Sequence, residues 1–266
     1  MSAGSFGKAL AAPIFATLRP SLARLDPGRF PGHDDLNALA GASLASGGGA
    51  PIRFVPPSPA KEPSTPYETR VFETGEVQTR PGNWHDLFNA LVWLAFPRTK
   101  AILNRLHREQ IVARRGEPQR GTARDVLTLF DEGGVIVACA DARLARLLLD
   151  FRWKELFWTR RAEVRRSMRF HVFGHAIYEK ALAPRKGVTA KALILDVSRM
   201  LLAEPVERRL AELDVRAAKY FSEPRALAST RSLAPLPILG IPGWEPANER
   251  EEYYDDASQF RPGRAG

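Results

Sequence analysis

The sequence Val126-Leu-Thr-Leu-Phe-Asp-Glu-Gly-Gly-Val-Ile-Val-Ala-Cys139 carries the strongest indication of the fold. Its two ends, residues 126–130 and 135–139, are rich in the β-branched and apolar residues that favour strands, and two glycines lie between them. The pattern predicts a β-hairpin with its turn at Asp131-Glu132. Because a tight turn pairs its strands antiparallel, the pattern favours an α+β class.

Local signals predict further elements on both sides of this stretch. Side chains alternate from Tyr67 to Arg80 around Thr74-Gly75-Glu76, which predicts a second β-hairpin. Met168 to Phe173 alternates as a single strand. Helices are predicted from Asn83, where Asp86 forms a variant of the capping box, to Phe96, and then after Pro97, after Asp141, after Gly174 and near Glu204–Phe221.

These elements together predict the architecture. We expect an α+β fold, a mainly helical single domain with short antiparallel β-hairpins and a long extended C-terminal segment that packs on the body. The chain has 266 residues, 44% of them hydrophobic, which is enough for a large core. The expected organisation is a helical and irregular lead-in over residues 1–50, one globular α+β domain over 51–245, and an acidic tail over 246–266.

Cysteine content and hydropathy indicate the compartment. The single cysteine, Cys139, cannot form an internal disulfide, which favours a reducing environment. No apolar run reaches the roughly 18 to 20 residues of a membrane-spanning helix. The apolar stretch after Lys8 is interrupted by Pro13 and has no convincing cleavage site, so it does not match a signal peptide. We therefore predict a cytoplasmic protein with no membrane partner.

Positive charge is concentrated in the middle of the chain. Residues 98–191 carry 21 basic and 10 acidic side chains, whereas the whole chain has a net charge of +9. Such a block suits nucleic acid or another polyanion. An ordinary solvated helix face, partly neutralised by the acidic tail, is the alternative interpretation. The candidate polyanion-binding residues are Arg160, Arg161, Arg165, Arg166 and Arg169.

Two predicted helices carry polar residues that could form a site. His85 and Asn89 lie four residues apart on a helix that is otherwise apolar, where a buried polar group without a partner costs about 1–3 kcal/mol. His175 and Glu179 have the same spacing on the helix after Gly174. If the two faces meet, His85, His175 and Glu179 could bind a divalent metal, and with Asn89 they are the candidate catalytic residues.

A purely structural hydrogen-bond network is the alternative for the same residues. His171 and His175 have the spacing of a helical metal pair, but the predicted strand before Gly174 separates them, and the glutamate of the zinc-peptidase motif is missing. Asp131 and Glu132 are explained by turn formation alone. Cys139 is expected to be a buried apolar residue rather than a nucleophile.

Four segments resemble a catalogued family: Asn83 to Pro97, Leu127 to Glu132, Phe173 to Glu179 and Leu239 to Trp244. They are similar to the bacterial family named domain of unknown function 3025, and the ending from Tyr254 also matches. The similarity extends from about Ile52 to Arg264. The resemblance implies a bacterial, cytoplasmic, single-domain protein, and it implies no activity.

Three function classes follow from these observations. The first is a hydrolase that acts on a phosphorylated or polyanionic substrate, with His85, His175 and Glu179 holding a metal or moving protons and with Arg165 or Arg169 neutralising substrate charge. The second is a non-catalytic protein that binds nucleic acid or another polyanion. The third is a structural or interaction protein without a catalytic site.

Overall fold

The computed structural model describes residues 10–57, 65–114 and 121–263. Helices dominate, and a short 3-10 helix, η1, precedes them at Pro13–Leu18. The helices are α2 (Arg19–Leu22), α3 (His33–Ala40), α4 (Tyr67–Thr74), α5 (Trp84–Ala95), α6 (Pro97–Ala113), α7 (Thr122–Gly133), α8 (Ala142–Leu149), α9 (Arg161–Ser167), α10 (His175–Ala181), α11 (Arg199–Ala203) and α12 (Val206–Ser222). The strands are β1 (Arg53–Val55), β2 (Glu76–Gln78), β3 (Gly134–Cys139), β4 (Met168–Val172), β5 (Thr189–Asp196) and β6 (Ala234–Pro237).

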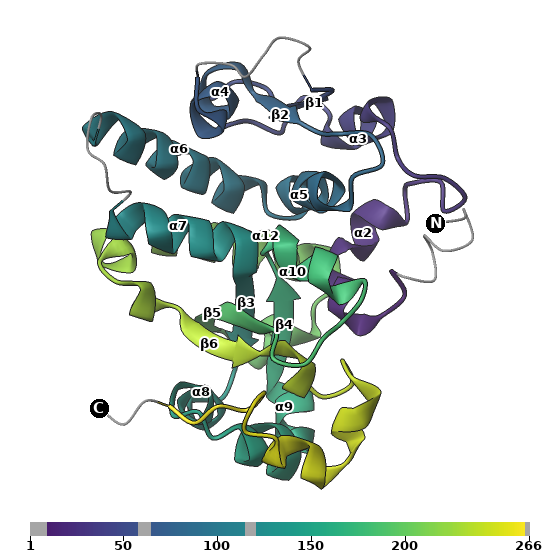
Figure 1. Ribbon diagram of the computed structural model, residues 1–266, viewed down its shortest axis with the longest axis vertical. Helices are drawn as coiled ribbons and strands as arrows, with labels where there is room; N and C mark the ends of the chain where they lie inside the picture. The colour runs from purple at the N-terminus through teal and green to yellow at the C-terminus, as the bar shows by residue number, and fades with distance from the viewer. Residues whose placement is uncertain (1–9, 58–64, 115–120, 264–266) are drawn as a thin grey trace.

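A four-stranded mixed sheet with the order β4-β3-β5-β6 lies at the centre. β3 and β5 run parallel, with Ile136 opposite Leu193, and the two outer strands run antiparallel to their neighbours. All six residues of β3 are buried. In Figure 1, α7 and α12 lie above the sheet and α8 and α9 lie below it. The predicted α+β class is therefore confirmed.

The hairpin predicted at residues 126–139 is wrong. The chain from Thr122 to Gly133 is helix α7, and only the second half of the stretch is a strand. Val126, Leu127 and Phe130 are buried on one side of the helix. Their spacing fits one face of a helix, but a short apolar run of this kind also fits a strand. The partners of β3 are β4 and β5, which lie far along the sequence.

The hairpin predicted at residues 67–80 is also wrong. Its first half is helix α4, which ends at Gly75 with a left-handed φ of 71°. Glycine adopts this conformation without the strain of a Cβ, so it ends the helix. Its second half, β2, pairs in parallel with β1 in a separate two-stranded sheet. The short antiparallel hairpins of the prediction are thus replaced by strands that pair across long connections.

The remaining predicted elements are found in the structure. α5 begins as predicted, because Asn83 Oδ1 accepts a hydrogen bond from the Asp86 backbone nitrogen. The Asp86 carboxylate binds the backbone and guanidinium of Arg80, however, so it does not complete a capping box. α8 is capped by Asp141 as expected. The C-terminal segment packs on the body: β6 joins the sheet, and the Tyr254 hydroxyl donates to the Gly240 carbonyl.

The N-terminal lead-in shares the core of the rest of the chain. Phe15 is fully buried and stacks on Phe88 of α5 and Tyr178 of α10. η1 thereby packs against the two helices that carry the predicted site residues. Among the described residues, no helix combines the length and the apolar character that crossing a membrane requires.

Candidate metal centre

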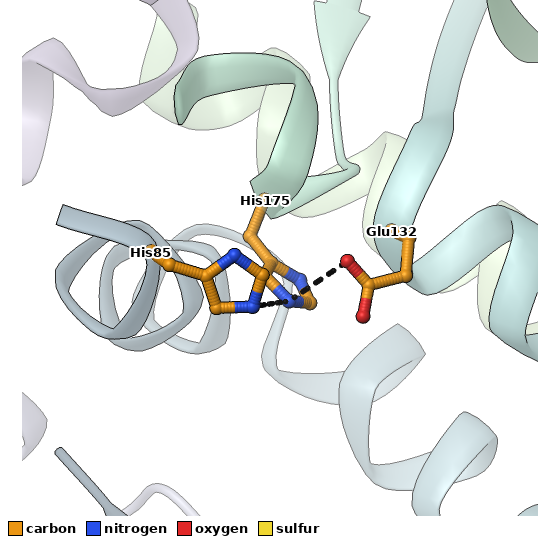
Figure 2. Close-up of side chains that lie close together, drawn as sticks. All are labelled: His85, Glu132 and His175. Carbon is orange, nitrogen blue, oxygen red and sulfur yellow. Dashed lines mark hydrogen bonds and ion pairs between the residues drawn. The ribbon is translucent and has the colours of Figure 1, made fainter. Parts of the chain in front are cut away.

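Three helices bring polar side chains together at one place (Figure 2). His85 lies in the first turn of α5, His175 is the first residue of α10, and Glu132 lies in the last turn of α7. α10 packs against both α5 and α7. Side chains on helices are held more precisely than side chains on loops, and here three separate helices contribute one group each.

The ligand atoms of these residues lie within metal-binding distance of one another. His85 Nε2 and His175 Nε2 are 3.1 Å apart, and His175 Nε2 is 3.4 Å from Glu132 Oε2. One ligand atom from each residue lies within 4.8 Å of the other two. Two atoms bound to one tetrahedral zinc ion at about 2.0–2.1 Å lie about 3.3–3.4 Å apart, so both contacts approach the edge length of such a site.

Glu179 fixes the orientation of His85. Its Oε2 lies 2.9 Å from His85 Nδ1. An ionised carboxylate only accepts hydrogen bonds, so His85 Nδ1 carries the proton and Nε2 presents a lone pair to the other ligands. A carboxylate behind the distal nitrogen is the usual partner of a metal-binding histidine.

His175 also has a carboxylate near its other ring nitrogen, but the two are not hydrogen-bonded and the ring is deeply buried. Its side chain is only 5% exposed, and Asp131 Oδ2 lies 3.8 Å from Nδ1, which has no hydrogen-bond partner among the described residues. Burial lowers the pKa of His175 to about 4, although Asp131 favours the charged ring. The ring is therefore neutral at physiological pH, which is the form that binds metals.

The cluster is open to solvent on one side. The side chains of His85, Glu132 and Glu179 are 31%, 45% and 50% exposed, respectively. Burial, followed by the negative charge of Asp131, raises the pKa of Glu132. Several acidic groups thus lie around the two imidazoles, and these surroundings suit a cation with an accessible coordination position.

Asn89, the fourth candidate catalytic residue, does not join this cluster. It is buried, and its amide nitrogen donates to the Tyr67 hydroxyl while its oxygen accepts from Lys100 Nζ. His171 also lies elsewhere, on β4, bound to Thr17 and Arg209. The structure therefore brings together three of the four candidate catalytic residues.

Glu132 and Asp131 were missed by the sequence analysis, which assigned them to a turn. Reading residues 122–133 as a helix would have placed Glu132 in its last turn, close to the neighbouring elements. The signal for that reading is the spacing of Val126, Leu127 and Phe130 on one helix face.

The arginine cluster does not reach the histidines. α9 precedes β4 and α10 follows it, so the five residues of β4, about 16 Å of extended chain, separate the two regions. Arg161 and Arg165 pair with Glu249 of the acidic tail, and Arg169 donates to backbone carbonyls. Arg165 lies before β4 and Arg169 near its start, whereas His175 follows its end, so their predicted role in neutralising a substrate at the histidines stays a prediction. This arginine cluster consists of Arg160, Arg161, Arg165, Arg166 and Arg169.

The family assignment rests on most of the chain. A family model described as "Protein of unknown function (DUF3025)" matches residues 52–264. The chain belongs to the DUF3025 family. The matched region of this DUF3025 protein contains His85, Glu132, His175 and Glu179. Comparisons with curated proteins and with solved structures gave no match.

Proposed function

We propose that this DUF3025 protein is a metal-dependent hydrolase. A divalent transition-metal ion would be held by His85, His175 and Glu132, and Glu179 would orient His85. Two imidazole nitrogens and one carboxylate oxygen form a donor set that zinc accepts, and catalytic zinc sites commonly use three protein ligands.

The convergence of the two Nε2 atoms carries the proposal. With its proton on Nδ1 toward Glu179, His85 presents a lone pair to His175 Nε2 at 3.1 Å. Two nitrogens this close need a proton or a metal ion between them. A shared proton accounts for the histidine pair alone, whereas a metal ion also accounts for Glu132 Oε2 at 3.4 Å from the same nitrogen.

The exposed side of the site determines the chemistry that it supports. A divalent ion held by His85, His175 and Glu132 would supply hydroxide at neutral pH, because such an ion lowers the pKa of bound water to about 7. His175 closes the buried side of the site, and the half-exposed Glu132 and Glu179 border the open side. The exposed Lys180 follows Glu179 on α10 and would supply positive charge to a phosphorylated substrate.

Metal content and hydrolysis test the proposal directly. Zinc-free protein is titrated with Zn²⁺ against a chromogenic chelator, and zinc-loaded protein is assayed with p-nitrophenyl phosphate, bis(p-nitrophenyl) phosphate and p-nitrophenyl acetate. We expect one zinc per chain and chelator-sensitive hydrolysis of a phosphate ester. Protein that takes up no metal would exclude the centre, and stoichiometric binding without hydrolysis of any of the three would exclude the hydrolase.

Matched variants locate the activity. His85→Asn, His175→Asn and Glu132→Gln should each lose metal, whereas His33→Asn removes a histidine of α3 whose Nε2 binds the Thr79 carbonyl and should retain it. Equal losses in His33→Asn would mean that the centre lies elsewhere.

Binding of nucleic acid through residues 98–191 receives less support. Arg161 and Arg165 are both engaged by Glu249, so part of the excess charge is internally neutralised. Affinity for RNA or DNA that falls steeply with salt would favour this alternative. The predicted cytoplasmic location stays a prediction.

A further inference from the structure

Behind the candidate metal centre lies a buried charged residue, Lys100 of α6. Its side chain is 6% exposed, and its Nζ lies 5.4 Å from the centre of the Trp93 ring. Nζ donates one hydrogen bond of 2.6 Å to Asp131 Oδ1 and one of 2.9 Å to Asn89 Oδ1. Lys100 therefore joins α5, α6 and α7 directly behind His175.

Packing alone gives a weak reason for this lysine. Burying an ion pair costs desolvation that the attraction often only offsets, so apolar residues of similar volume are commonly as stable. A ligand does not explain it either. The cavity beside Lys100, lined by Tyr67, Glu68 and His107 among others, is about 10 Å³ and admits nothing larger than a water molecule.

The second oxygen of Asp131 connects the pair to the metal centre. Oδ1 binds Lys100, while Oδ2 lies 3.8 Å from His175 Nδ1. One carboxylate is thus hydrogen-bonded to the lysine and lies close to the histidine without a hydrogen bond to it. The hydrogen bond from Lys100 therefore holds the carboxylate beside the buried edge of the ring.

We infer that Lys100, held by Asn89, is a positioning residue for the metal centre: it fixes the Asp131 carboxylate against His175 Nδ1, so that His175 Nε2 is turned toward the metal. This inference rests on the proposed function. It also gives Asn89 a role, since Asn89 acts on the site through Lys100 and Asp131 rather than by touching a substrate.

Zinc affinity of folded variants tests the inference. In Lys100→Met the Asp131 carboxylate loses its hydrogen bond to Nζ. We expect zinc to bind about 10- to 100-fold more weakly, which is the usual effect of removing an outer partner of a metal-binding histidine. Thr99→Val is the matched control. It removes the hydrogen bonds of a neighbouring buried hydroxyl on the same helix to Asp214, away from His175. It should lower the melting temperature but leave the zinc affinity within twofold of wild type.

A spectroscopic signature separates positioning from general stability. In zinc-loaded protein labelled with ¹⁵N-histidine, the His175 Nδ1–H resonance should shift and exchange faster with water in Lys100→Met but not in Thr99→Val. If Lys100→Met does not fold, the isosteric Asp131→Asn serves instead, with the same expected losses.

Each outcome decides between the two proposals. Wild-type protein that binds no zinc would overturn the proposed function and this inference together. Wild-type protein that binds zinc, with unchanged affinity and an unchanged Nδ1–H resonance in the folded Lys100 or Asp131 variant, would overturn the inference alone. An equal loss of affinity in Thr99→Val would also overturn it.

Discussion

Gly174 lies directly against the backbone of Gly133: a Cβ built on Gly174 would be 2.5 Å from the Gly133 nitrogen. The same Cβ would lie 2.5 Å from the Glu132 carbonyl oxygen and from the Gly134 nitrogen. The Gly174 nitrogen also donates to the Gly134 carbonyl. The start of α10 is thus held against the end of α7, and His175 comes to lie beside Glu132.

Substituting Gly174 should therefore disturb both the fold and the metal centre. Gly174→Ala forces backbone to move, which we expect to cost about 1–3 kcal/mol of the free energy of unfolding and to weaken zinc binding. Gly133→Ala is the control, because a Cβ there meets nothing within 4 Å and alanine favours a helix. Denaturant unfolding and zinc titration of both variants check this. Equal stability and affinity in the two would show that the close contact is unimportant.

The part of the site that the sequence predicted depends on local signals. Asn83 begins α5 and Gly174 precedes α10, so the four-residue spacings on these helices could be read correctly. The assumption that the two faces meet came from the cost of burying polar groups on an apolar helix. Asn89, one of the polar groups behind that assumption, instead accepts a hydrogen bond from Lys100.

The part that the sequence did not predict depends on long-range packing. The run from Val126 to Phe130 suits a strand or a helix, and only the packing of α7 on the sheet and α6 decides between them. β5, which pairs in parallel with β3, begins about fifty residues after β3 ends. The prediction of a strand at residues 126–130 implied a turn at Asp131-Glu132. Neither residue was therefore predicted to belong to a site.

Glu179 should tune the metal affinity without being essential for it. In Glu179→Gln the amide oxygen can still accept from His85 Nδ1, but the negative charge is gone. We expect zinc to bind about 10-fold more weakly, a smaller loss than in His85→Asn. Glu163→Gln, which breaks the exposed ion pair with Arg160 on α9, should have no effect. A Glu179 variant with wild-type affinity would show that the pair is only a surface contact.

Removing one member of the buried Lys100–Asp131 pair should lower the free energy of unfolding more than replacing both members with apolar residues. Lys100→Met leaves a buried carboxylate without its partner, which typically costs about 3–5 kcal/mol. The double variant Lys100→Met/Asp131→Leu removes both charges, so we expect it to be more stable than Lys100→Met alone. Denaturant unfolding of the zinc-free single and double variants measures the coupling, and strictly additive losses would contradict a paired interaction.

The dependence of stability on pH should report on His171. Its ring is buried on β4, where Thr17 Oγ1 lies 3.3 Å from Nδ1 and Arg209 Nε donates to Nε2. Burial, and then the charges of Arg209 and Arg169, lower the pKa of His171 from 6.5 to about 3. The unfolded chain therefore binds a proton between these two pH values that the folded protein does not.

The sign of the effect follows from this difference in proton binding. The contribution of His171 to stability is fully present above pH 6.5 and is lost progressively as the pH falls toward 3, by up to about 1.4 kcal/mol per pH unit. In His171→Gln the amide can serve the same neighbours but does not titrate. The free energy of unfolding of this variant, measured by denaturant titration from pH 7 to pH 4, should fall less steeply than that of wild type. Parallel curves for the two proteins would mean that His171 is protonated in the folded state.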